Sequence, residues 1–355
     1  MRLAISTGGG DAPGLNAVIR AAVLAAVHRG WECVGIRRGF DSLLGGEPPV
    51  PLGPNEVRGI THLGGTILGT SNRGNPLKWR HQRPDGVWEE RDRSQELLDS
   101  FRANRLDALI AIGGDGTLSI ALELCKRGLP VVGVPKTIDN DVAGTVTTFG
   151  FDTAVATATD AIDKVHSTAE SHERVMVVEV MGRHAGFIAL SSGIAGSADV
   201  ILIPEIPFDI NKVCDKIRRR EAEGRHFSIV VVAEGALPKG GTVSLIDPAH
   251  ARLGGIADKV AHSIEEMTGK ETRSLVLGHL QRGGSPTTFD RNLGLRFGAA
   301  AVRLVAEQKF GMMVALQPPN IVAVPLAEAI AKPKRVAIDS DTVATARDLG
   351  ISFGD

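Results

Sequence analysis

The sequence predicts an α/β fold with sheets rich in parallel strands, divided into two domains. Short apolar runs recur along the chain, and many end in glycines and polar residues before a stretch with helical periodicity. This alternation of strand-like and helix-like segments is typical of βαβ units. The length of 355 residues exceeds one typical domain and favours two.

The composition excludes several classes of partner. Hydrophobic residues make up 43% of the chain, with 42 glycines and 4% aromatic residues, which suits a glycine-rich α/β enzyme. A formal net charge of −1 gives no basis for binding nucleic acid or a membrane surface. No apolar run approaches the ~18 residues of a membrane span, and no signal-peptide pattern opens the chain. The three cysteines are far apart and are typical of free thiols in a reducing compartment, so we expect a cytoplasmic protein.

The first elements form a pattern suited to anions. A strand over residues 3–6 is followed by a glycine-rich loop over 7–14 and by a helix over about 16–28. Bare amides and a helix dipole favour a negatively charged ligand there, although the loop matches neither the P-loop nor the dinucleotide pattern. A tight structural turn is the alternative. Residues 64–76 are a second glycine-rich stretch, and turn residues within 77–93 predict a surface β-hairpin.

The next two strands also end in polar groups. The strand over 107–112 leads into Gly113-Gly114-Asp115-Gly116-Thr117, where a helix starts. The strand over 131–134 stops at Pro135, which has no N–H to donate, and is followed by Lys136, Thr137, Asp139, Asn140 and Asp141. The carboxyl ends of parallel strands share one ligand-binding edge, so we expect these groups to converge there. Two carboxylates so close repel each other unless a metal or a basic group lies between them. An acidic turn is the structural alternative.

The second half repeats this organisation. We expect a helix over about 153–167, a loop and helix start over 241–258, a helix over about 292–309, and strands over 175–180, 199–203, 227–233 and 273–277. The final five residues are expected to fray. Arginine forks bind phosphate bidentately, so several of them favour a phosphorylated substrate, whereas a single one is more often a surface ion pair. The arginines beside glycines or strand ends are Arg73, Arg174, Arg183, Arg273 and Arg282.

Six motifs resemble the 6-phosphofructokinase family. They are Thr-Gly-Gly-Gly-Asp-Ala-Pro-Gly-Leu-Asn at 7–16, Gly-Gly-Asp-Gly-Thr at 113–117, Pro-Lys-Thr-Ile-Asp-Asn-Asp at 135–141, Glu-Val-Met-Gly-Arg at 179–183, Glu-Thr-Arg at 271–273 and Leu-Gly-His-Leu-Gln-Arg-Gly-Gly-Ser-Pro at 277–286. The match runs in consistent order from about residue 3 to 310. It implies two similar doubly wound, Rossmann-like domains, and a glycolytic kinase that phosphorylates fructose 6-phosphate at the 1-hydroxyl, with its active site in a cleft between the two domains.

The resemblance also implies a division of labour. Residues 1–150 plus about 281–331 would form the phosphoryl-donor domain, and residues 151–280 plus about 332–355 the sugar-phosphate domain. Asp139 would be the catalytic base, Thr137 would position groups beside it, and Asp115 with Asp141 would hold Mg²⁺. The donor would be bound by Gly10, Arg73, Gly113, Gly114, Asp115, Gly116, Thr117 and Lys136, with Gly10, Arg73 and Arg183 facing the transferring phosphoryl group.

The sugar phosphate would be held mainly by residues of the second half. The resemblance assigns to it Thr137, Asp139, Arg174, Met181, Gly182, Arg183, Glu234, Arg273, His279 and Arg282. Of these, Arg174 and Arg273 would come from a neighbouring subunit of a homodimer or homotetramer. Both arginines stand at the starts of their strands, which is the sheet edge opposite to the ligand-binding loops.

Two positions give opposite indications about the donor. In the resembling family, the position of Gly116 is glycine in ATP users and usually aspartate in pyrophosphate users. Lys136 is typical of pyrophosphate users, whereas many ATP users have glycine there. A lysine binds a terminal phosphate of either donor, and a missing carboxylate cannot exclude ATP, so we expect ATP. A pyrophosphate-dependent phosphotransferase is the alternative. More remote alternatives are a kinase of the NAD or lipid type and a non-catalytic sugar-phosphate sensor.

Overall fold

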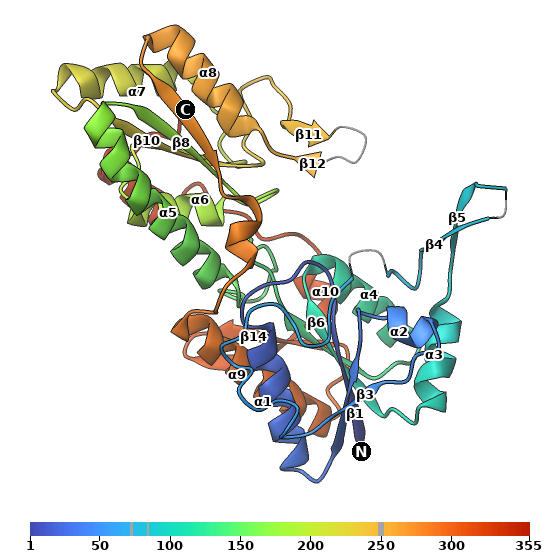
Figure 1. The fold of residues 1–355 in the computed structure, drawn as a ribbon. Helices are drawn as coiled ribbons and strands as arrows, with labels where there is room; N and C mark the ends of the chain where they lie inside the picture. Colours follow the sequence, from blue (N-terminus) through green and yellow to red (C-terminus); the bar gives the residue numbers. More distant parts are fainter. Residues whose placement is uncertain (72–73, 84, 248–251) are drawn as a thin grey trace. The chain divides into compact units, whose positions relative to one another are not determined.

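A computed structural model describes residues 1–71, 74–83, 85–247 and 252–355 and divides into two compact units (Figure 1). Unit 1 comprises Met1–Ile138, Val142–Asp152 and Arg282–Pro333. Unit 2 comprises Asp139–Asp141, Thr153–Gln281 and Lys334–Asp355. Residues 139–141 therefore group with unit 2, although the division expected from sequence assigned them to the first domain. Both units have parallel-rich sheets with helices, which confirms the expected α/β class.

Unit 1 is built on a seven-stranded sheet with the order β15-β14-β7-β6-β1-β2-β3. The inner strands run parallel to one another, and the edge strands β3 and β15 are antiparallel to their neighbours. Val, Ile, Leu and Ala fill the central strands because both faces of the sheet are covered. The strands are β1 (Arg2–Thr7), β2 (Glu32–Ile36), β3 (Val50–Leu52), β6 (Ala108–Gly113), β7 (Val131–Pro135), β14 (Met312–Gln317) and β15 (Asn320–Pro325).

Helices cover both faces of this sheet. Helices α1 (Leu15–Val27) and α9 (Thr288–Ala306) lie side by side (Figure 1) and contribute to one buried apolar cluster. A second cluster lies under the other helices of the unit, α2 (Asp41–Leu44), α3 (Ser94–Ala103), α4 (Asp115–Lys126) and α10 (Leu326–Ala329). The α9 helix begins four residues before its expected start, because the Thr287 side chain caps it by accepting a hydrogen bond from the Asp290 N–H at 3.2 Å.

Unit 2 has a four-stranded, fully parallel sheet with the order β13-β8-β10-β9. Its strands are β8 (Val175–Val180), β9 (Val200–Leu202), β10 (Ser228–Ala233) and β13 (Thr272–Val276). One face packs against α7 (Ile210–Ala222) and α8 (Ile256–Thr268). Helix α6 (Phe187–Ala195) packs against β9 and β10. The remaining helices within the described residues are α5 (Phe151–His172), α11 (Asp341–Asp348) and the 3₁₀ helix η2 (Gly278–Arg282).

Two segments test the expectations for irregular regions. The hairpin expected within 77–93 is confirmed as β4 (Trp79–Gln82) and β5 (Trp88–Arg91). The segment expected as loop before α8 contains two short antiparallel strands, β11 (Leu245–Asp247) and β12 (Arg252–Leu253).

The expected fraying of the chain end is wrong. Phe353 is fully buried, and Ser352 extends the sheet beyond β9 by accepting a hydrogen bond from the Ile201 N–H at 2.9 Å and donating one to the Asp199 carbonyl at 3.0 Å. The terminal segment is ordered because its apolar side chains complete the core of unit 2.

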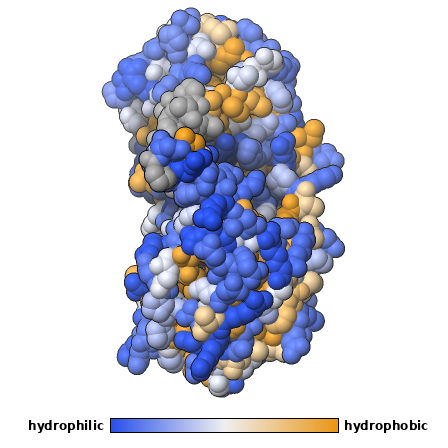
Figure 2. Space-filling view, turned by 90° about the vertical axis from the view of Figure 1, so that its right-hand side faces the viewer, coloured by the Kyte–Doolittle hydropathy of each residue, from blue (hydrophilic) through white to orange (hydrophobic). Residues whose placement is uncertain are grey.

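None of the described helices combines the length and the apolar character that crossing a bilayer requires. Figure 2 shows apolar residues in small groups among hydrophilic ones on the face that it displays.

Candidate functional site

A pocket of about 310 Å³ lies at the carboxyl ends of the strands of unit 1. Two glycine loops form much of its wall, one after β1 and one at the start of α4, and Phe40 and Ile120 add apolar surface. Such a combination suits a ligand with both an anionic and a flat apolar part. The lining residues are Gly8, Gly9, Gly39, Phe40, Ser71, Gly74, Asn75, Gly116, Thr117 and Ile120.

Thr117 explains why two of these loop positions are glycine. A Cβ atom added at Gly8 would lie 2.7 Å from the Thr117 hydroxyl oxygen, and one added at Gly113 would lie 2.3 Å from the Thr117 Cβ. Both distances are far below van der Waals contact. The buried Thr117 side chain therefore fills the space between the two loops, and this packing holds them together.

Packing does not explain why residue 116 is glycine. It lies inside α4 and lines the pocket, and a Cβ atom added there would meet no atom within 4 Å. Glycine within a helix costs about 0.5–1 kcal/mol relative to alanine. Asp115, the first residue of this helix, is exposed next to it. The bare Gly116 leaves open space inside the pocket for a ligand.

Two cations lie against the first glycine loop. Lys136 is buried, and its ammonium group donates a hydrogen bond to the Gly10 carbonyl. Arg282 donates one to the Asp11 carbonyl at 3.2 Å, and its guanidinium Nη1 would lie 3.0 Å from a Cβ atom at Gly10. Arg282, which the sequence assigned to the second substrate, thus contacts the loop assigned to the donor. The positive charges of Lys136 and Arg282 favour an anionic ligand beside this loop.

The acidic segment after β7 is held by a lysine from the end of the chain. The Lys334 ammonium donates to the Asn140 side-chain oxygen at 2.9 Å, and the Lys334 N–H donates to the Asp141 carbonyl at 2.7 Å. The ammonium also lies 5.2 Å from the centroid of the Phe187 ring. Asn140 has a positive φ of 55°, a conformation that asparagine tolerates better than most residues. These contacts fix the turn from which the Asp139 and Asp141 side chains project.

Sequence reasoning assigned no role to Lys334. It lies almost two hundred residues from Asn140 in the chain, and only the fold brings the two together. Burial lowers the pKa of Lys334 to about 8, while the charge of Asp141 acts in the opposite direction. No local sequence pattern distinguishes Lys334 from its neighbour Lys332, which is exposed.

In unit 2, the predicted residues Met181, Gly182, Arg183, Glu234 and His279 follow the carboxyl ends of the strands. The Gly235 N–H donates to the Gly182 carbonyl at 3.2 Å, and a Cβ atom at Gly235 would lie 2.1 Å from the Arg183 carbonyl oxygen. The loops after β8 and β10 are therefore in close contact, which brings Glu234 beside the Met181–Arg183 turn. The Met181 N–H donates to the Gln281 side-chain oxygen at 3.3 Å. This contact joins the β8 loop to η2, which contains His279.

Arg174 and Arg273 lie at the opposite edge of the same sheet. Arg174 precedes β8, and Arg273 is the second residue of the neighbouring strand β13. Both arginines form ion pairs with Glu271, at 2.8 Å and 2.5 Å respectively. Hydrogen bonding from Arg174 is the main cause that lowers the pKa of Glu271. The pair forms a cationic group remote from the loops that follow the strands of unit 2.

The remaining expectations concern Arg73 and the Mg²⁺ ligands. Arg73 lies outside the described residues. Asp115 and Asp141 belong to different units, and among the described residues no group of three or more His, Cys, Asp or Glu side chains is arranged to hold a metal ion. Mg²⁺ is commonly held by one or two carboxylates together with water and substrate phosphates, so the exposed Asp115 beside the pocket fits such a site.

Glu179, within the strand β8, is a buried carboxyl group without an assigned role. Its side chain is 3% exposed and accepts a hydrogen bond from the Ala257 N–H at 3.0 Å, at the start of α8. Burial raises the pKa of Glu179, and backbone N–H groups of residues 255–257 partly offset this effect. Glu179 thus links β8, which ends at Val180, to the first turn of α8.

The raised pKa predicts a pH-dependent contribution to stability. The folded protein holds the Glu179 proton more tightly than the unfolded chain, whose ordinary value is 4.5. This contribution is therefore complete below about pH 4.5 and is lost as the pH rises through the folded pKa. Glu179→Gln, which cannot ionise, should gain melting temperature relative to the native protein as the pH rises from about 4.5 to 8.

Thermal unfolding followed by circular dichroism at each pH measures this difference. Glu223→Gln is the matched control, because that carboxyl is exposed at the end of α7 in the same unit and forms no ion pair among the described residues; its melting temperature should differ from the native one by a constant amount. A constant difference between Glu179→Gln and the native protein across the pH range would contradict the prediction.

Comparisons with known proteins agree with these motifs. Residues 2–305 match the family described as Phosphofructokinase. The chain is 55% identical over 354 residues to a protein of Chloroflexus aggregans named ATP-dependent 6-phosphofructokinase, covering 100% of this chain and 98% of the relative. It is 50% identical over 361 residues to a Streptomyces coelicolor protein named pyrophosphate–fructose 6-phosphate 1-phosphotransferase, covering all of both chains.

A solved structure supports the same assignment. Phosphofructokinase of Pichia pastoris in the T-state superposes with a TM-score of 0.81 at 32% identity, covering 99% of this chain. This chain spans only 37% of the length of the Pichia chain. With the family match, the curated relatives and the shared fold in agreement, this chain belongs to the phosphofructokinase family.

Proposed function

We propose that this protein transfers the terminal phosphoryl group of ATP to the 1-hydroxyl of fructose 6-phosphate, giving fructose 1,6-bisphosphate and ADP. The names of relatives that are 48–55% identical support the ATP-dependent reaction. We also propose that the protein is cytoplasmic, which suits three cysteines that form no disulfide and a glycolytic reaction.

The observation that carries the choice of donor is the open space at Gly116. No atom of the fold would meet a Cβ atom there, so the fold itself does not require glycine. The pocket beside it also presents Phe40 and Ile120, an apolar surface that a nucleotide base can use and that pyrophosphate cannot. Unit 1 would be the donor domain, with its glycine loops around the phosphates.

Pyrophosphate is the second candidate donor. Relatives that are 50–52% identical carry the name of a pyrophosphate-dependent enzyme. Lys136 favours the same reading, because lysine at this position is typical of pyrophosphate users in the family. The two donors differ in how much of the pocket they would fill. ATP would place its nucleoside there, whereas pyrophosphate consists of two phosphates alone.

The chemical step requires alignment and charge stabilisation more than covalent help. Asp139 would accept the proton of the sugar 1-hydroxyl as its oxygen attacks the terminal phosphorus of the donor, and the bond between that phosphorus and the leaving phosphate breaks. Asp115, assisted by Asp141, would hold Mg²⁺, which neutralises phosphate charge when bound. Gly10, Arg73 and Arg183 would face the transferring group, where cations stabilise the charge of its equatorial oxygens.

Unit 2 would be the sugar-phosphate domain. Met181, Gly182, Arg183 and Glu234 lie on the two loops that touch through Gly235, and His279 lies on the η2 segment joined to them through Gln281. Arg282 would contact both substrates, since it already lies against the donor loop. Arg174 and Arg273 lie at the far edge of their own sheet and would serve a neighbouring subunit in a homo-oligomer.

A donor assay tests the proposal directly. With fructose 6-phosphate and Mg²⁺, kcat/KM should be greater with ATP than with pyrophosphate. Gly116→Asp should lower kcat/KM for ATP by about 10- to 1,000-fold, because a carboxylate about 4 Å from a phosphate repels it by several kcal/mol. Turnover with pyrophosphate should change far less.

Gly116→Ala is the matched control, because it adds a methyl group without charge into open space. Greater efficiency of the native protein with pyrophosphate would reject ATP as the donor. Absence of fructose 1,6-bisphosphate with either donor would reject the proposed reaction.

Replacing the base should remove most of the catalytic rate. Positioned proton transfer is worth about 10²–10⁴-fold, so Asp139→Asn should lower kcat by at least ~100-fold. The KM for fructose 6-phosphate should change little, because asparagine retains the shape of the side chain and one acceptor oxygen. Steady-state kinetics with both substrates measures the two constants, and near-normal turnover of the variant would remove Asp139 from this role.

The shared site predicts complementation between inactive subunits. Arg273→Ala and Asp139→Asn proteins should each be nearly inactive. When their subunits exchange, some sites in the hybrids would combine an intact Asp139 with an intact Arg273 from the neighbour, so activity should rise on mixing. Mass spectrometry of differently labelled subunits verifies the exchange, and exchange without recovered activity would count against a shared site.

A further inference from the structure

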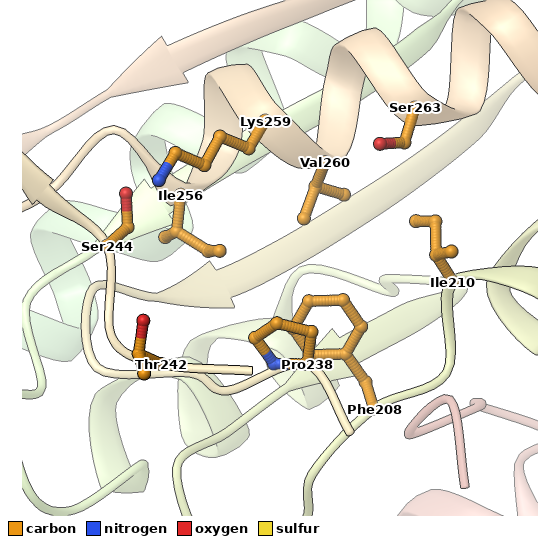
Figure 3. A pocket seen from close by; sticks show the side chains of 9 residues that line it. All are labelled: Phe208, Ile210, Pro238, Thr242, Ser244, Ile256, Lys259, Val260 and Ser263. Atoms are coloured by element: carbon orange, nitrogen blue, oxygen red, sulfur yellow. The ribbon is translucent and has the colours of Figure 1, made fainter. Parts of the chain in front are cut away.

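Unit 2 contains a second pocket, of about 190 Å³, that the proposed reaction does not use (Figure 3). Its walls come from the segments that follow β9 and β10 and from one side of α8. None of the residues assigned above to the sugar phosphate lines it. The lining residues are Phe208, Ile210, Pro238, Thr242, Ser244, Ile256, Lys259, Val260 and Ser263.

One end of this pocket is apolar. Figure 3 shows the Phe208 ring and Pro238 lying together, with Ile210 and Val260 on the other side of the space. Phe208 and Val260 are almost fully buried, so they belong to the fixed core of unit 2. This end offers a rigid surface on which an apolar group is removed from water.

The other end carries a cation and two hydroxyl groups. Figure 3 shows the ammonium of Lys259 extending toward Ser244, with Thr242 on the same side of the pocket. Lys259 forms no ion pair with any residue that the structure describes. Ser244 is 2% exposed, and its hydroxyl oxygen has no hydrogen-bond partner within the described part of the chain. Buried hydroxyl groups are nearly always paired, so Ser244 lacks the partner that a bound molecule would supply.

The dimensions limit what this molecule is. A volume of 190 Å³ corresponds to about six water molecules at ~30 Å³ each, and drug-sized sites are larger, at about 300–1,000 Å³. An aromatic ring or a short branched chain fills the apolar end. A carboxylate fits the polar end, because it accepts hydrogen bonds from Ser244 and Thr242 and pairs with Lys259.

From this arrangement we infer that the pocket between α8 and the 238–244 segment binds a small amphipathic monocarboxylate, with its apolar body on Phe208 and its carboxylate at Lys259 and Ser244. Lys259 supplies the charge selectivity, and the buried Ser244 hydroxyl fixes the orientation of the carboxylate. Phenylacetate is a suitable probe, since it combines one ring with one carboxylate. Phenylacetamide is its neutral counterpart of nearly the same shape.

Ligand-observed NMR titration of the full-length protein with each compound tests this inference. Phenylacetate should bind at least about tenfold more tightly than phenylacetamide, as expected for charge-assisted hydrogen bonds. Lys259→Gln should abolish most of this difference. Ser244→Ala should also weaken phenylacetate binding, while the ligand-free protein should melt no lower than the native one, because the lost hydroxyl has no partner in the described structure.

Lys212→Gln is the matched control, because Lys212 is exposed on α7 of the same unit and lies outside the pocket lining; its binding should equal that of the native protein. Equal affinity for the two compounds would overturn the assignment of a carboxylate. No binding at concentrations up to about 10 mM, equivalent to less than ~3 kcal/mol, would overturn the site. Phenylacetate binding that both pocket variants leave unchanged would show that the compound binds elsewhere, which would also overturn it.

Discussion

The ligand-binding edges of both sheets depend on close contacts that only glycine allows. At these contacts the backbone lies directly against other backbone or side-chain atoms. In unit 1, Thr117 fills the space that Gly8 and Gly113 leave open. In unit 2, Gly235 lies against the Arg183 carbonyl. A side chain at any of these glycines would force the loops apart, because the contacts it would make are shorter than real Cβ atoms allow. The polar groups on the loops keep their positions because the loops cannot separate without losing this packing.

Parallel topology decides which side chains share an edge. Every parallel strand of a sheet delivers its following loop to the same side, so Asp115 and Lys136 of unit 1 reach one region although a helix separates them in sequence. The same rule sends Arg174 and Arg273 to the other side of the sheet of unit 2, where Glu271 holds both. The proposed oligomeric site follows from this separation, since a catalytic role for these arginines requires a subunit other than their own.

Three cations at the candidate site are held in place by hydrogen bonds to the protein. Lys136 and Arg282 meet the first glycine loop at its carbonyl groups, which leaves amides and open space toward the ligand. Lys334 holds the acidic turn through Asn140 and the backbone of Asp141. Each of these cations already has a protein partner, so it is oriented before any phosphate binds. Phosphoryl-transfer enzymes stabilise the transition state mainly with preorganised charges of this kind.

The sequence by itself determined the fold class, the strands that lead into the glycine and acidic loops, and the residues of those loops, because these depend on local periodicity and on motifs of adjacent residues. Only the tertiary structure decided what depends on distant segments. Lys334 reaches Asn140 from the end of the chain, Phe353 is buried where fraying was expected, and residues 139–141 group with unit 2. The open space at Gly116 is likewise a property of the fold, because whether a Cβ atom would meet a neighbour depends on packing that no local pattern encodes.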